Sequence, residues 1–142
     1  MQFTTVILAA VSLALSASAI PAPSPATGLA TRQFEGTHTG QGTYFEVGLG
    51  ACGRQNSDAD FIAAVSESFF DTYPGATPNP NNNPVCQRRI TAQYQGRSVT
   101  VAVADRCEAC ALYDLDFSPA AFTQLAGSLS VGRISGMTWE LL

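Results

Sequence analysis

Lysine is absent from this sequence, and charged residues of all kinds make up only 13% of its 142 positions. All seven basic residues are arginines, and eleven acidic residues bring the net charge to −4 at pH 7. Proteins that hold nucleic acid by neutralising its phosphates need an excess of positive charge, so we expect no nucleic-acid partner. The only histidine, His38, has no identifiable acid or nucleophile as a catalytic partner, and we expect it to lie at the surface.

The sequence also lacks a hydrophobic run long enough to cross a membrane. Its apolar run at residues 6–15 falls well short of the roughly 20 residues that a transmembrane helix needs. Ala-Ser-Ala follows at residues 17–19 and fits the small-residue rule for signal-peptide cleavage. We therefore expect residues 1–19 to be a signal peptide, the mature protein to be secreted and extracellular, and no membrane to be a partner.

The mature chain divides into a leader and one domain. Residues 20–35 begin with a run rich in Pro, Ala and Ser that can bury little, so we expect a flexible leader. Residues 36–142 are enough for one domain with its own hydrophobic core. Within that domain, residues 78–84 (Pro-Asn-Pro-Asn-Asn-Asn-Pro) offer no apolar side chain to bury. We interpret them as a spacer loop in preference to a wall of a binding groove.

Four cysteines in a secreted chain predict two disulfides, for which three pairings are possible. A structural zinc site usually takes its cysteines as two closely spaced pairs, but Cys52 and Cys86 each stand alone. A redox pair would begin a helix after a strand in a βαβ pattern, which is not visible here. We therefore expect no metal and no cofactor, and we favour the pairs Cys52–Cys86 and Cys107–Cys110.

The rest of the chain is organised around residues 98–122. β-branched residues at 98–104 predict a buried strand, which delivers Asp105 at its end. A turn with two cysteines follows. A second carboxylate, Asp116, comes after this turn and lies between two apolar residues in the sequence. Ser118 is a good N-cap and Pro119 suits the first helical position, which predicts a short helix over residues 118–125. Paired carboxylates are what glycoside hydrolysis requires.

Short strands separated by turn signals make up most of the remaining sequence. Strands are expected over residues 36–45, 62–65, 86–94 and 134–142, with a short helical turn after residue 65. Residues 95–97 separate two strands and predict a hairpin turn. Met137, Trp139 and Leu141 alternate along the last strand, so we expect that face, Trp139 included, to be buried. Several short strands with one short helix are typical of a small closed barrel.

Five motifs together resemble a known family. They are Gly-Thr-Tyr-Phe at 42–45, Gly-Leu-Gly-Ala-Cys-Gly at 48–53, Ile-Ala-Ala-Val-Ser at 62–66, Val-Ala-Asp-Arg-Cys-Glu-Ala-Cys at 103–110 and Leu-Asp-Phe-Ser-Pro-Ala-Ala-Phe at 115–122. In this order they are similar to RlpA-like, expansin-like and barwin-like proteins, and especially to small secreted fungal loosenin-like proteins. The resemblance implies a mainly β fold, a six-stranded double-psi β-barrel with one or two short helices, over residues 36–142.

The resemblance also implies roles for individual residues. Asp116 stands where expansins and family-45 endoglucanases carry the catalytic acid, and Asp105 matches the Asp of the expansin Asp-Arg-Cys turn. Thr43 matches the Thr of the expansin Thr-x-Tyr pattern, whose Tyr falls on Phe45 unless Tyr44 takes its place. We expect Asp105 to lie within reach of Asp116, so that charge repulsion and partial desolvation both raise the pKa of Asp116.

Departures from the family pattern argue against hydrolysis. The endoglucanase base would fall on Val47, and the adjacent Glu46 is expected to face away from the cleft because side chains alternate along a strand. Asp105 has a structural alternative, since a carboxylate at a strand end can accept turn N–H groups or pair with Arg106. Asp116 therefore remains as an acid-like residue that need not catalyse any cleavage.

Three kinds of function are compatible with these residues. Sugar binding uses aromatic faces beside hydrogen-bonding groups, and the candidates are Thr43, Tyr44, Phe45, Tyr73 and Tyr113. The leading hypothesis is an expansin-like monomer that binds and loosens cell-wall polysaccharide, such as cellulose, chitin or a related glycan, without hydrolysis. One alternative is an enzyme, a lytic transglycosylase or glycoside hydrolase, which released sugars would reveal. The other is a protease inhibitor or effector on the same barrel, which stoichiometric inhibition of a cysteine protease would reveal.

Overall fold

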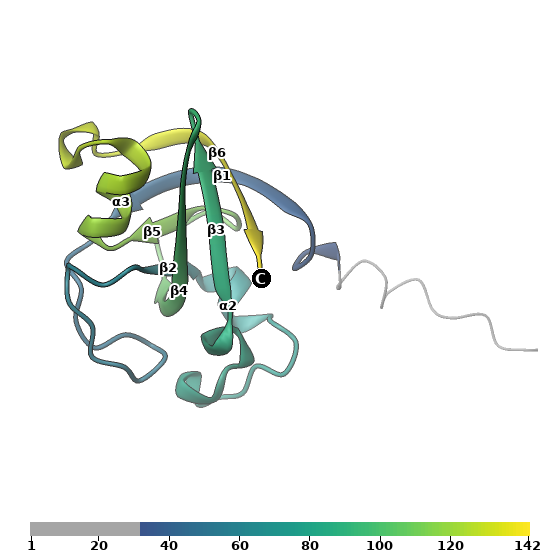
Figure 1. Ribbon diagram of the computed structural model, residues 1–142. Coiled ribbons are helices and arrows are strands. Elements are labelled where there is room, and N and C mark those ends of the chain that lie inside the picture. Colours follow the sequence, from purple (N-terminus) through teal and green to yellow (C-terminus); the bar gives the residue numbers. More distant parts are fainter. Residues whose placement is uncertain (1–31) are drawn as a thin grey trace, which may run out of the picture.

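Six β-strands close into a barrel in the computed structural model, which describes residues 32–142 (Figure 1). The strands are β1 (Thr37–Tyr44), β2 (Ile62–Ser66), β3 (Arg89–Tyr94), β4 (Arg97–Cys107), β5 (Leu115–Phe117) and β6 (Ile134–Leu141). The predicted mainly β, six-stranded barrel is thereby confirmed. The expected signal peptide and most of the expected leader lie outside the described residues. In residues 32–142, no helix has the length and apolar character to cross a membrane.

Neighbouring strands of the barrel are mostly distant in sequence. Their order is β1-β5-β2-β4-β3-β6, and β6 pairs with β1 to close the barrel. β1 runs parallel to β5 and β2 runs parallel to β4, whereas the other neighbours are antiparallel. β3 and β4 form the predicted hairpin, and both of its turn residues, Gln95 and Gly96, have positive φ (46° and 77°). Closure gives every strand a partner on each side.

The interior is filled by apolar side chains that alternate along the strands. Met137 and Trp139 on β6 are buried, which confirms the predicted inward face of that strand. Leu115 and Phe117 on β5 are fully buried, so Asp116 between them points outward. The largest fully buried side chains include Trp139, Phe69, Phe70, Phe117, Phe122, Ile90, Leu115 and Leu125.

Short α-helices accompany the barrel, among them α2 (Glu67–Asp71) and α3 (Pro119–Ala126). As predicted, Ser118 caps α3, with its hydroxyl accepting the backbone N–H of Ala121, and Pro119 lies in the first turn. Gly127 ends the helix in a left-handed conformation (φ 91°) that favours glycine. Because α3 follows β5 directly, its cap also fixes the end of the strand that carries the second carboxylate.

Both predicted disulfides are present, Cys52–Cys86 and Cys107–Cys110. The first joins a loop at Cys52 to a short 3₁₀ helix at Cys86 across a sequence separation of 34, and the second closes the turn that begins at the end of β4. Each has a Cα–Cα distance of 5.5 Å, within the ordinary range for a disulfide.

Some predicted boundaries differ from the structure. Cys86 lies in a 3₁₀ helix (Pro84–Gln87) and not in a strand, because Pro84 lacks the N–H that a strand ladder needs and begins a helical turn instead. β4 continues to Cys107, beyond the predicted end at residue 104, so Asp105 is part of the strand. Asp116 lies in a three-residue strand, β5, where only an approach to the helix was expected.

His38 is the clearest correction. It was expected at the surface, but it lies on β1 opposite Trp139 of β6 and is only 5% exposed. Its ring stacks on Tyr113 with 4.5 Å between centroids and 12° between planes. The imidazole therefore packs as a small aromatic ring among partners that lie far away in the sequence.

Candidate functional site

Two acidic side chains and one threonine share a row across the barrel. β5 lies between β1 and β2, and its central residue, Asp116, is the register partner of Thr43 on one side and of Ala64 on the other. Beyond β2, Ala64 is in turn paired with Asp105 of β4. Because directly opposed residues share one face of a sheet, the row lies together on the outer face of the barrel.

Asp116 keeps a proton more readily than an ordinary aspartate. Burial raises the pKa of its carboxyl group most strongly, and the Asp105 carboxylate raises it further. The Thr43 hydroxyl donates to Asp116 Oδ1 at 2.6 Å, and this hydrogen bond and the positive charge of Arg133 both lower the pKa. Burial prevails, so the predicted increase in the pKa of Asp116 is confirmed in direction.

Asp116 lies in a surface cavity of about 330 Å³. The walls combine carboxyl, hydroxyl, amide and guanidinium groups with one tyrosine and the shorter disulfide. The lining residues are Gln41, Thr43, Tyr44, Cys107, Ala109, Cys110, Asp114, Asp116, Gly132 and Arg133. Such a mixture of donors and acceptors around one half-buried acid suits a ligand that carries many hydroxyl groups.

Three polar residues of this cavity were not predicted as site residues: Gln41, Asp114 and Arg133. Arg133 Nη1 donates to Gln41 Oε1 at 2.7 Å. Asp114 accepts the backbone N–H of Gln41 on Oδ1 (2.7 Å) and that of Ala111 on Oδ2 (3.3 Å). Both carboxylate oxygens of Asp114 are thus engaged, whereas Asp116 Oδ2 has no hydrogen-bond partner within residues 32–142. The three residues come from separate segments and form no local motif, so no sequence signal points to them.

Asp105 has the structural role that was considered for it. Its Oδ1 accepts the backbone N–H groups of Ala51 and Arg106, both at 2.8 Å. The bond from Ala51 ties a loop to the end of β4, across 54 positions of sequence. The alternative ion pair is not formed, because the Arg106 guanidinium is held by other carboxylates.

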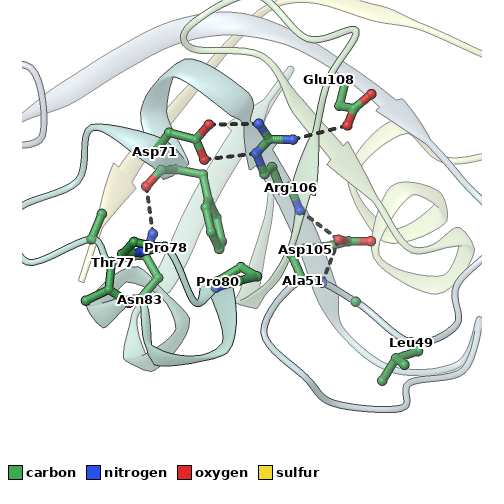
Figure 2. A pocket seen from close by; sticks show the side chains of 13 residues that line it. Leu49, Ala51, Asp71, Thr77, Pro78, Pro80, Asn83, Asp105, Arg106 and Glu108 are labelled. Carbon is green, nitrogen blue, oxygen red and sulfur yellow. Dashed lines mark hydrogen bonds and ion pairs between the residues drawn. The ribbon is translucent and has the colours of Figure 1, made fainter.

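A second cavity, of about 800 Å³, lies beside Asp105 (Figure 2). In this view Leu49 lies on one side of it, and Thr77 and Pro78 lie on the other. The interpretation of residues 78–84 as a spacer is therefore corrected, because Pro78 and Pro80 are lining residues. Both prolines are exposed, whereas Asn83 of the same segment is buried and donates its side-chain amide to the carbonyl of Phe70 at 2.7 Å.

Arg106 is the centre of an ion-pair cluster at this second cavity (Figure 2). Its Nε and Nη2 donate to the two oxygens of Asp71 at 2.9 and 2.7 Å, and Nη1 donates to Glu108 at 3.1 Å. Glu67 lies 3.0 Å from Nη2. The hydrogen bonds from Arg106 lower the pKa of Asp71, because they favour its ionised form. Three carboxylates surround one guanidinium, so the cluster is negative overall.

The structure brings only some of the five candidate sugar-binding residues together. Thr43 and Tyr44 line the Asp116 cavity, and Tyr44 is 39% exposed. Phe45, Tyr73 and Tyr113 are half-buried and line neither of the two cavities. Tyr73 and Tyr113 pack against the hydrophobic core instead. The expected aromatic surface is thus reduced to Tyr44.

A metal is disfavoured by the chemistry of the one candidate cluster in the described part of the chain. Ligand atoms of Cys107, Cys110 and Asp116 lie within 4.8 Å of one another. The two sulfurs are joined in a disulfide, however, and are not the thiolates that a metal would need.

Comparisons with known proteins agree with this architecture. The chain is 36% identical over 107 residues to the papain inhibitor of Streptomyces mobaraensis, which covers 73% of this chain and 71% of that protein. The solved structure of the Streptomyces papain inhibitor matches with a TM-score of 0.68 at 34% identity, covering 75% of this chain and 94% of that one.

Two further comparisons extend the likeness. A variant expansin of Clavibacter michiganensis, solved in complex with cellohexaose, matches with a TM-score of 0.58 at 23% identity, which shows a shared fold over 75% of this chain and 50% of the expansin. A protein of Arthroderma benhamiae, named as a homologue of the allergen Asp f 7, is 31% identical over 118 residues, 73% of this chain and 38% of that protein. A family model described as lytic transglycolase matches residues 37–135. The chain therefore belongs to the RlpA-like double-psi β-barrel family.

Proposed function

We propose that this protein is a secreted, expansin-like protein that binds cell-wall polysaccharide in the Asp116 cavity and loosens it without hydrolysis. The observation that carries the proposal is the state of Asp116. Its carboxyl group is half-buried in a surface cavity, its pKa is raised, and one of its oxygens has no partner within residues 32–142. Such a group stays protonated to a higher pH than an ordinary aspartate, and its proton can be donated to a sugar oxygen.

The neighbouring groups support binding of a sugar chain. The hydroxyl of Thr43 holds Asp116 Oδ1 and leaves Oδ2 for a ligand. Arg133 and Gln41 place a guanidinium and an amide on the same cavity wall, where they can donate to sugar hydroxyl groups. Tyr44 adds a partly exposed ring. A protonated Asp116 would compete for the hydrogen bonds that hold neighbouring glycan chains together, and such competition loosens the wall.

Within residues 32–142, no second carboxylate that lines the Asp116 cavity is free to act as a base, which favours loosening over cleavage. Glycoside hydrolysis needs a second carboxylate that is free to act as base or nucleophile. Asp114 lines the cavity but accepts backbone N–H groups on both oxygens. Val47 occupies the position of the endoglucanase base, and Glu46 is exposed but does not line the cavity.

Binding and sugar release distinguish the proposal from an enzymatic function. The purified protein should deplete from solution onto insoluble cellulose, chitin or peptidoglycan and should release no reducing or anhydro sugars. Asp116→Asn should stay folded and lower the binding constant by about tenfold, the loss expected for one hydrogen bond of a charged or acidic group. Glu46→Gln is the matched control and should bind as the parent does. Sugar release that Asp116→Asn abolishes would instead establish a lytic enzyme.

A second candidate function is inhibition of a papain-like cysteine protease. The observation that favours it is the 36% identity to a papain inhibitor over 71% of that protein's length. Titration of papain with the purified protein should then show stoichiometric loss of peptidase activity. No loss of activity at a large molar excess would exclude this candidate and leave polysaccharide binding unaffected.

A further inference from the structure

The segment of residues 48–56, here called the Leu49 loop, presents an apolar side chain to solvent. Leu49 is 72% exposed, the highest value among the large hydrophobic residues exposed in the described part of the chain. It stands between Gly48 and Gly50, so no bulky side chain flanks it in sequence. A side chain at Gly50 would collide with the carbonyl oxygen of Ala104, so glycine is required for the loop to lie this close to the barrel.

The Leu49 loop is held firmly despite this exposure. Within the loop, the N–H of Gly50 donates to the carbonyl of Arg54 at 3.1 Å, and that of Asn56 donates to the carbonyl of Gly48 at 3.0 Å. Leu49 and Gln55 form an isolated β-bridge. The loop is therefore a closed, hydrogen-bonded unit and not an open strand of chain.

Several bonds fix the Leu49 loop to the rest of the molecule. The Cys52–Cys86 disulfide joins it to the loop that walls the second cavity. The Arg54 guanidinium donates to the carbonyl of Val103 on β4 at 2.7 Å. The carboxylate of Asp105 accepts the N–H of Ala51, as Figure 2 shows. A segment anchored at so many points loses little conformational entropy when a partner binds it.

The surroundings of the Leu49 loop combine a cavity with a cluster of negative charge, which together favour a particular kind of partner. Leu49 borders the 800 Å³ cavity, whose opposite side is formed by Pro78 and Thr77 (Figure 2). Stiff loops on two sides of a hollow present shape without having to fold on contact. The negative cluster around Arg106 lines the same cavity, and Glu108 is the most exposed of its carboxylates. It favours a partner that places basic groups beside the contact.

We propose that the Leu49 loop is the part of this protein that enters the active-site cleft of a papain-like cysteine protease. The proposal rests on the second candidate function and assigns it to a surface distinct from the Asp116 cavity. A protease cleft accepts a projecting segment whose apolar side chain fills a side-chain pocket, and Leu49 between two glycines supplies such a segment. Rigid anchoring lowers the conformational entropy that the segment loses when it binds in the cleft.

Matched substitutions of exposed apolar residues test the assignment. Leu49→Asp should raise the inhibition constant for papain by about tenfold or more, the loss expected when a central interface side chain is removed. Val131→Asp is the control, because Val131 is 48% exposed and lines neither cavity. It should inhibit as the parent does. Circular dichroism and thermal unfolding show whether each variant is folded. If Leu49→Asp does not fold, Leu49→Ser replaces it in the inhibition assay.

The outcomes separate the two claims. If the parent protein does not inhibit papain, both the second candidate function and this inference are wrong. A parent that inhibits, with Leu49→Asp or Leu49→Ser equal to Val131→Asp, overturns the assignment of the Leu49 loop alone. If Leu49→Asp loses polysaccharide binding but keeps inhibition, the loop belongs to the glycan site, which also overturns the inference. Glu108→Gln should slow association with papain at low salt and converge with the parent at high salt.

Discussion

Asp105 and Asp116 flank the same residue, Ala64, from opposite sides of β2. Adjacent strands lie about 4.8 Å apart, so the two backbones are separated by about 10 Å. Their surroundings give the two carboxylates different tasks. Asp105 is bound by two backbone N–H groups, whereas Asp116 is held on one oxygen by the Thr43 hydroxyl. Asp105 thus ties a loop to β4 at the edge of the larger cavity, whereas Asp116 has one oxygen available in the smaller cavity.

Binding of polysaccharide should depend on the protonation of Asp116. Because burial raises the pKa of this group, the protonated donor persists to higher pH than in an ordinary aspartate. The binding constant should therefore be greatest at acidic pH and fall as the pH rises through the pKa of Asp116. Depletion assays from pH 3 to 7 measure this. Asp116→Asn should show a flat profile over the same range, and a parent profile equally flat would contradict the proposed role.

Thr43→Val removes the hydroxyl that donates to Asp116 but keeps the shape of the side chain. Since that hydrogen bond lowers the pKa of Asp116, its loss should raise the pKa further. The free energy of unfolding at pH 7 should fall by about 1 kcal/mol, the net value of one hydrogen bond. Carboxyl NMR titration and chemical denaturation measure the two effects. Thr43→Ser retains the donor and should leave the pKa close to that of the parent.

Asp105→Ala and Asp105→Asn separate hydrogen bonding from charge. Both substitutions remove the carboxylate that raises the pKa of Asp116, so that pKa should fall in each. Only Asp105→Ala leaves the N–H groups of Ala51 and Arg106 without this acceptor, which should cost about 1–3 kcal/mol in the free energy of unfolding. Asp105→Asn keeps an acceptor oxygen and should stay close to the parent. Equal destabilisation of the two variants would contradict the structural role assigned here.

Local signals were enough to predict much of this fold. Ser118 and Pro119 mark the start of α3 because capping depends only on residues within one turn. Met137 and Trp139 were assigned to the core because alternation along a strand is also local. The double-psi topology and the choice of Thr43 and Asp116 as site residues followed from the family resemblance, which carries long-range information that a single sequence pattern does not. The hydrogen bond between these two residues was not predicted.

The residues that were missed depend on contacts between distant segments. Arg133 reaches the Asp116 cavity from the segment before β6, and its partner Gln41 lies on β1. Asp114 is held by a backbone group of β1. His38 is buried because β1 pairs with β6 and places it against Trp139. A polar residue of this kind has no local pattern that distinguishes an interior from an exterior position.

The buried position of His38 makes the stability of the protein sensitive to pH. Burial lowers its pKa because it disfavours the charged imidazolium, and Nε2 has no hydrogen-bond partner within residues 32–142. An unfolded chain binds a proton at this histidine near its ordinary pKa of about 6.5, whereas the folded protein resists protonation. The contribution of His38 to stability is therefore complete above that pH and is lost as the pH falls below it.

Thermal unfolding of the parent should accordingly show a lower Tm at pH 5.5 than at pH 7.5. His38→Phe keeps a ring that can stack on Tyr113 and removes the titrating group, so its Tm should change little between these values. Asp116 acts in the opposite direction, because its raised pKa favours the folded state at acidic pH. Asp71, whose pKa is lowered, contributes only at more acidic pH. Comparing the double variant His38→Phe with Asp116→Asn against Asp116→Asn alone measures the contribution of His38 to the pH dependence of Tm without that of Asp116. If adding His38→Phe to Asp116→Asn leaves the dependence between pH 5.5 and 7.5 unchanged, His38 is not its source.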